Sequence, residues 1–188
     1  ASAVGEVVLY NVFETLTKIQ SDGTVQPLLA EKWEASPDQK VWTFHLRRDA
    51  KFHNGAPFNA AAVQFAFARA ASAQSTNKDK TLFTSFERID APDAYTVVLH
   101  SKNPNPNLPF LLGQATAIVV EPGSAASNTT APVGTGPYQL AEWRKGASLV
   151  LKKWDGYRNA SNIAMQQVTF RFISDASAQM AALQAGDI

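Results

Sequence analysis

Apolar residues with helical spacing predict helices in three parts of the chain. In the first, the apolar residues from Leu9 to Leu16 fall at positions i, i+3, i+4 and i+7, which places them on one helix face. In the second, Asn59 is suited to accept hydrogen bonds from the first free amides. In the third, Asp175 can cap the start and Gly186 can end the helix. The expected helices cover residues 6–18, 60–73 and 175–185, with a short helix at 108–112 and a helical turn at 28–30 after Pro27.

Alternation of apolar and polar residues predicts strands elsewhere. The clearest case is residues 41–47, where Trp42, Phe44 and Leu46 share one face. Tight turns such as Asn54-Gly55 separate many of these segments. We therefore expect an α+β fold with a mixed, mostly antiparallel sheet and flanking helices. The expected strands are 33–35, 41–47, 86–90, 95–101, 117–120, 138–143, 149–153 and 168–173.

Composition narrows the possible partners. The 188 residues include 17 Lys and Arg against 16 Asp and Glu, which gives a net charge of +1. This balance does not favour nucleic acid or an anionic membrane as a partner. There is no cysteine, so disulfides and thiolate metal sites are excluded. No apolar run approaches the roughly 20 residues that a membrane-spanning helix needs.

Residues suited to catalysis or metal binding form no pattern. The three histidines, His45, His53 and His100, do not have the spacing of a metal site, and we expect surface or hydrogen-bonded roles for them. The sequence has no Gly-x-Ser-x-Gly elbow, although a Ser-His-Asp cluster formed by folding stays possible. We therefore expect no enzyme activity, no metal and no cofactor.

The segment "PVGTGPY" at residues 132–138 resembles the start of a phosphate-binding loop. Such a loop lies between a strand and a helix, so that free amides meet the phosphate. Here Pro137 removes one donor, and the residues after it alternate as a strand. We therefore expect a glycine corner that turns the backbone sharply into the strand at Tyr138, and no nucleotide site.

Short motifs in a fixed order run through nearly the whole chain. They are "DG" at 22–23, "PLLAEKW" at 27–33, "TFHLR" at 43–47, "KFHNGAP" at 51–57, "GTGPY" at 134–138, Tyr157, and "ALQAGDI" at 182–188. This series resembles the family 5 extracellular solute-binding proteins, which serve peptide, nickel and opine ABC transporters. The apolar end at Ile188, directly after a helix stop, is abrupt, so we expect a piece of a longer protein.

The resemblance implies a periplasmic-binding-protein type II (class C) architecture, in which two lobes close on a ligand. Residues 1–145 would form the extra subdomain of the first lobe. Residues 146–188 would begin the main first-lobe domain, and the second lobe would be absent. A single lobe offers only part of the ligand contacts, so we expect no measurable solute binding by this chain alone.

The function implied is solute binding for an ABC importer, with a small peptide or another organic solute as ligand and a membrane permease as partner. We expect a periplasmic monomer, or one at the outer face of the cytoplasmic membrane, that binds no nucleic acid. The resemblance places Asn11, Phe83 and Thr116 near the ligand. From the residues alone these are equally a helix-surface amide, a core aromatic and a buried strand hydroxyl.

Other functions stay open at this point. Within the family, opine or nickel ligands are alternatives, although the arginine of nickel-binding members is absent near residues 114–117. Outside the family, the alternatives are a hydrolytic enzyme domain and a stand-alone interaction module. Activity on a chromogenic ester would favour the first, and a stable partner interface larger than about 1,000 Å² would favour the second.

Overall fold

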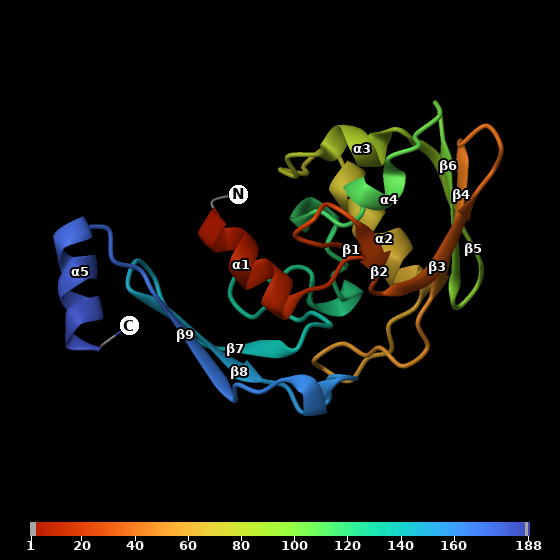
Figure 1. The fold of residues 1–188 in the computed structure, drawn as a ribbon. Helices are drawn as coiled ribbons and strands as arrows, with labels where there is room; N and C mark the ends of the chain where they lie inside the picture. The colour runs from red at the N-terminus through yellow and green to blue at the C-terminus, as the bar shows by residue number, and fades with distance from the viewer. Residues whose placement is uncertain (1–2, 187) are drawn as a thin grey trace.

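The computed structural model describes residues 3–186 and 188, which form helices around three antiparallel sheets (Figure 1). The helices are α1 (Ala3–Val12), α2 (Ala60–Ala71), α3 (Lys80–Thr84), α4 (Leu108–Leu111) and α5 (Ala176–Ala185). The strands are β1 (Thr17–Ile19), β2 (Val25–Pro27), β3 (Ala30–Ala35), β4 (Val41–Leu46), β5 (Phe86–Asp93), β6 (Thr96–Ser101), β7 (Tyr138–Arg144), β8 (Ser148–Lys153) and β9 (Gln167–Arg171). Three short 3₁₀ turns are η1 (Ala115–Ala117), η2 (Pro122–Ser124) and η3 (Ala160–Asn162). The predicted α+β class is confirmed.

The largest sheet has the strand order β3-β4-β6-β5. Its central strands β4 and β6 alternate between buried and half-buried positions, as the period-two pattern predicts. Phe44 on β4 lies opposite Trp33 on β3 and Val97 on β6, and its side chain is completely buried. The β3–β4 hairpin at residues 36–40 is likewise where the sequence predicts it.

Helix α2 packs beside β5 and β6 and covers this sheet (Figure 1). It begins where Asn59 accepts a hydrogen bond of 3.1 Å from the Ala62 amide. Phe58, Val63 and Phe67 are each at most 1% exposed, so the apolar face of the helix is core. Burying each such side chain contributes about 1.5–3 kcal/mol.

The second sheet has the order β7-β8-β9 and extends, with α5 at its far end, away from the rest of the chain (Figure 1). Leu149 and Leu151 on β8 are buried, whereas α5 has no buried residue. The turn with Gly146 joins β7 to β8, so this hairpin spans the division expected after residue 145. That division stays a prediction, and strand pairing joins its two sides.

Three expected elements are wrong. Helix α1 ends at Val12 and not near residue 18, because residues 13–16 form a buried link that leads into β1. Pro27 does not start a helical turn; it ends β2, which pairs with β1. Residues 117–120 are not a strand, although Val119 and Val120 are buried, because Val119 makes a single bridging bond from its amide to the Glu14 carbonyl (3.0 Å). Pro27 is compatible with the start of a helical turn and with the end of a strand, and the buried run 117–120 is compatible with a strand and with an irregular segment. Hydrogen bonds made in the folded chain decided between these alternatives.

Candidate functional site

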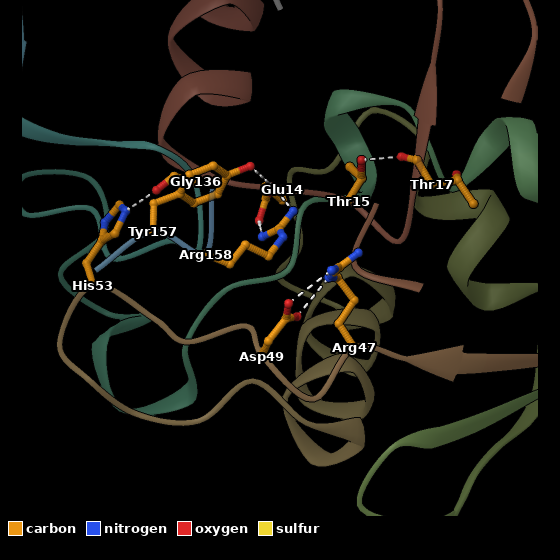
Figure 2. Close-up of polar contacts among 9 residues, drawn as sticks. All are labelled: Glu14, Thr15, Thr17, Arg47, Asp49, His53, Gly136, Tyr157 and Arg158. Atoms are coloured by element: carbon orange, nitrogen blue, oxygen red, sulfur yellow. Dashed lines mark hydrogen bonds and ion pairs between the residues drawn. The ribbon is translucent and has the colours of Figure 1, made fainter. Parts of the chain in front are cut away.

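The buried link after α1 fixes the position of that helix. Every residue from Val12 to Thr17 is buried. The Thr15 hydroxyl donates to the Thr17 carbonyl at 2.6 Å (Figure 2). The Thr17 hydroxyl donates to the Pro109 carbonyl, also at 2.6 Å. The Glu14 carbonyl accepts from the Val119 amide, as described above. These bonds attach the end of α1 to α4 and to the segment after η1.

The glycine corner packs against the last turn of α1. The Gly136 amide donates to the Val12 carbonyl at 3.0 Å. A Cβ atom on Gly134 would lie 2.0 Å from the Val12 carbonyl oxygen, and one on Gly136 would lie 2.6 Å from the Asn11 carbonyl oxygen. Neither glycine has a positive φ, so close backbone contact, and no special dihedral angle, requires glycine here.

This packing also answers the question of phosphate binding. The Gly134 amide points to His53, and the Gly136 amide is taken by Val12. The element that follows the corner is the strand β7, and not a helix. Both glycine amides therefore serve the packing of the corner, in agreement with the expectation that it shapes backbone.

His53 holds the corner from the other side. Its Nδ1 accepts from the Gly134 amide (3.3 Å), and its Nε2 lies 2.9 Å from the Gly136 carbonyl oxygen (Figure 2). Because an amide can only donate, Nε2 must carry the proton and donate to Gly136. The His53 ring also packs edge-on against the Trp154 ring, with the two ring centres 4.9 Å apart. Burial lowers the pKa of His53 and favours this neutral form.

A buried ion pair connects α1 to the segment after β8. The Arg158 Nη1 and Nη2 atoms donate to the two carboxylate oxygens of Glu14, each at 2.7 Å, and both side chains are 4% exposed (Figure 2). The Tyr157 hydroxyl donates to Glu14 Oε1 at 3.1 Å. Burial, together with the Glu14 charge, raises the pKa of Tyr157 to about 12. The charges of Glu14 and Arg158 cancel, so the three side chains form a hydrogen-bonded bridge of no net charge between the link after α1 and the segment after β8.

Sequence reasoning missed this bridge. The available signal was a single carboxylate, Glu14, within the apolar run from Val12 to Leu16. A charge in such a run is rarely buried without a partner. Nothing in the sequence identified Arg158, which lies 144 positions away, as that partner.

Two adjoining depressions flank the second half of α1. One, of about 490 Å³, is lined by residues that include Asn11, Glu14 and Lys18. The other, of about 610 Å³, is lined by residues that include Glu6 and Thr116. Tyr10 and Ile19 line both, so we call the two together the α1 trough. The Tyr10 hydroxyl donates to the Gly113 carbonyl at 3.1 Å, which fixes the ring between the two halves.

The structure brings two of the three expected ligand residues to the α1 trough. Asn11 lines one half, and Thr116 lines the other. The Thr116 hydroxyl donates to Asp79 Oδ2 at 2.6 Å. Phe83 lies elsewhere: it is 3% exposed and packs on Phe67 with ring centres 5.2 Å apart, so its side chain presents almost no surface. A ligand role for Phe83 stays a prediction, and its burial does not favour it.

The other histidines lie on the surface of the large sheet. His45 pairs with Glu34 at 3.1 Å, and His100 pairs with Asp90 at 3.0 Å. Within residues 3–186 and 188, no three His, Asp or Glu residues converge as metal ligands would. In the same part of the chain, no helix is both long and apolar enough to cross a membrane.

Comparisons with known proteins agree on one family. Residues 24–188 match the family described as bacterial extracellular solute-binding proteins, family 5 Middle. The glutathione-binding protein GsiB of Salmonella choleraesuis is 29% identical over an alignment of 188 positions, which covers 98% of this chain and 37% of that protein. The periplasmic oligopeptide-binding protein OppA of Haemophilus influenzae is 30% identical over an alignment of 205 positions, gaps included, which covers 96% of this chain and 38% of that protein.

A solved structure supports the same assignment. The binding protein AgaA of A. tumefaciens R10, in complex with agropinic acid, superposes with a TM-score of 0.91 at 32% identity, over 98% of this chain and 38% of that one. The chain thus spans about two fifths of the length of the relatives that it matches. The family consists of solute-binding proteins and not of enzymes, as expected from the sequence. This chain belongs to the bacterial extracellular solute-binding proteins of family 5.

Proposed function

We propose that the chain is part of the solute-binding component of an ABC importer and contributes the α1 trough to its ligand site. The solute is a small peptide or a related amino-acid derivative, received in the periplasm or at the outer face of the membrane and passed to a permease. The observation that carries this proposal is the position of Asn11 and Thr116, expected to contact the ligand, in the two halves of one trough.

The geometry of the trough suits an extended peptide. Tyr10 and Ile19 offer apolar surface along its length, while Asn11, Thr116 and Lys18 offer polar groups. Binding proteins of this kind hold extended ligands between closing lobes through such polar groups and ordered water. OppA and GsiB, whose names specify oligopeptides and glutathione, support a peptide ligand. AgaA, bound to agropinic acid, supports an opine as the second candidate.

The test is a titration followed by backbone amide shifts in nuclear magnetic resonance, with trialanine, glutathione and agropinic acid at millimolar concentrations. Peptide binding predicts shifts at Asn11 and Thr116 with trialanine or glutathione, and shifts with agropinic acid alone would select the opine. Asn11→Ala should reduce the shifts, and Asn103→Ala, on an exposed loop, should not. The absence of shifts along the trough with every solute would overturn the proposal.

Affinity provides a second test of the same proposal. One lobe supplies only part of the contacts, so binding by the chain alone should be visible as amide shifts at millimolar solute but too weak to give heat in a calorimetric titration with di- and tripeptides. Saturable binding at micromolar concentration would refute this expectation. Size-exclusion chromatography at the same concentration tests the proposed monomer.

A further inference from the structure

The two halves of the α1 trough differ in chemical character. The half of about 490 Å³, which we call the apolar half, has in its lining apolar side chains from separate segments of the chain: Phe13, Leu28, Pro137 and Ile163. The half of about 610 Å³, which we call the polar half, is lined mainly by polar and charged side chains: Glu6, Lys78, Asp79, Gln114 and Thr116. One trough therefore offers two different environments to the two ends of a solute.

Several polar groups in the lining of the apolar half are already engaged within the protein. The Glu14 carboxylate accepts hydrogen bonds from Arg158 and Tyr157, and the Thr15 hydroxyl donates to a backbone carbonyl. Lys18, which is exposed, is the other charged side chain among the described lining residues. A polar ligand group placed in this half would give up hydrogen bonds to water and regain few of them. An apolar side chain suits the apolar half better.

Tyr10 stands at the boundary between the halves, because it and Ile19 line both. The Tyr10 hydroxyl donates to the Gly113 carbonyl at 3.1 Å. A Cβ atom on Gly113 would lie 2.8 Å from Ile19 Cγ1, so Gly113 also packs directly against Ile19. Burial, and then the charge of Glu6, raise the pKa of Tyr10, so the phenol keeps the proton that it donates. The ring is thus held in place although Tyr10 is 42% exposed.

We propose that Tyr10 is a specificity-determining residue, whose ring divides the trough so that the solute places an apolar side chain in the apolar half and polar groups in the polar half. This inference rests on the proposed function and narrows the solute to peptides with an apolar side chain at one fixed position. Position matters because the ring separates the halves: the same side chain on another residue of the peptide would meet the ring or the polar half.

The probes are trialanine and the tripeptides Leu-Ala-Ala, Ala-Leu-Ala and Ala-Ala-Leu, which have the same charged ends. They are titrated into the 188-residue chain and followed by amide shifts in nuclear magnetic resonance, whose concentration dependence gives each dissociation constant. We expect one leucine peptide to bind at least about fivefold more tightly than trialanine, since its side chain leaves water for apolar surface. That peptide should also shift the amides of Lys18 and Ile163 most strongly. The other two should bind as trialanine does.

Three variants test the part played by the ring. Tyr10→Ala removes it, and the three leucine peptides should then bind within about twofold of one another. Tyr10→Phe keeps the ring and loses only the hydrogen bond to Gly113, so it should retain more of the preference than Tyr10→Ala. Trp143→Ala is the matched control: it removes an aromatic residue of similar exposure, 45%, that lines neither half, and it should keep the full preference.

The outcomes separate this inference from the proposed function. If the tripeptides shift both halves but leucine is preferred at no position, the proposed function stands and the division by Tyr10 is wrong. An unchanged preference in Tyr10→Ala, or an equal loss in Trp143→Ala, would likewise refute the role of Tyr10. If no tripeptide shifts either half, the peptide form of the proposed function has failed, and this inference fails with it.

Discussion

Glu14 and Arg158 form a bidentate ion pair across 144 positions of sequence, with both N–O distances at 2.7 Å and both side chains 4% exposed. The pair joins the buried link after α1 to the segment that follows β8. It therefore attaches the β7–β9 sheet to the helix that lines the α1 trough. Withdrawing two charges from water is costly, and the pair is favourable only while both partners are present.

Breaking this pair should destabilise the fold more than breaking a surface pair. Glu14→Gln keeps the side-chain shape but leaves the Arg158 charge buried without a counter-charge, and we expect a loss of about 3–5 kcal/mol. Urea denaturation measures this loss. Glu142→Gln breaks the exposed Glu142–Arg144 pair and should cost less than about 1 kcal/mol.

The double variant Glu14→Leu/Arg158→Met provides the internal check. It removes both charges, so its loss of unfolding free energy should be clearly smaller than the sum of the losses in the single variants Glu14→Leu and Arg158→Met. Additive losses would show that the two side chains stabilise the fold independently, contrary to the bridge.

The close packing at the glycine corner predicts that a methyl group added there destabilises the fold. Alanine at Gly134 would place its Cβ 2.0 Å from the Val12 carbonyl oxygen, so backbone must move, and we expect a loss of about 3 kcal/mol or more. Gly146 has φ +77° and nothing within 4 Å, so Gly146→Ala carries only the dihedral cost of about 1–2 kcal/mol. Thermal unfolding of both variants tests whether Gly134→Ala is the more destabilising of the two. A smaller loss at Gly134 than at Gly146 would contradict the close contact.

Two buried threonines give a matched pair. The buried Thr135 hydroxyl has no hydrogen-bond partner within residues 3–186 and 188, whereas the Thr15 hydroxyl donates to the Thr17 carbonyl at 2.6 Å. Valine has nearly the same shape, so Thr135→Val should be neutral or stabilise by up to about 1 kcal/mol, and Thr15→Val should cost about 1–2 kcal/mol. Chemical denaturation compares them. Equal losses would show that Thr135 has a partner after all.

Local patterns predicted the elements whose ends are decided locally. Asn59 and Asp175 each accept from the amide three residues on; α2 begins at the expected residue, and α5 begins one residue after the expected start, directly behind its cap Asp175. The β3–β4 hairpin follows from alternation and a turn. These features depend on neighbours within a few positions, so the sequence contains their full cause.

Long-range contacts decided the features that the patterns missed. Helix α1 ends at Val12, whose carbonyl accepts from Gly136, 124 positions later. The family resemblance, and no local pattern, led to the expectation that Asn11 and Thr116 contact the ligand. Both residues line the α1 trough, which is formed only when α1 packs near the segment at η1. The pairing of Glu14 with Arg158 depends in the same way on residues that folding alone brings together.

His53 makes stability depend on pH. Its pKa is lowered in the folded protein by burial, whereas in the unfolded chain it has the ordinary value near 6.5. The stabilising contribution is therefore complete above pH 6.5 and is lost as pH falls from 6.5 through the folded pKa, since the unfolded chain takes up the proton first. The hydrogen bond to the Gly136 carbonyl and, to a lesser extent, the charge of Glu14 favour protonation of His53 and oppose this effect, but burial dominates.

We expect the free energy of unfolding, measured by urea denaturation, to decrease as pH is lowered from 7.5 to 4.5, and part of this slope to disappear in His53→Gln. A protonated His53 would present an N–H to the Gly134 amide, 3.3 Å away, and lose that hydrogen bond. His45→Gln, at a half-buried histidine that pairs with Glu34 on the large sheet, is the control and should keep the slope. If the unfolding free energy of His53→Gln depends on pH as that of the unaltered chain does, the proposed role of neutral His53 in holding the glycine corner is refuted.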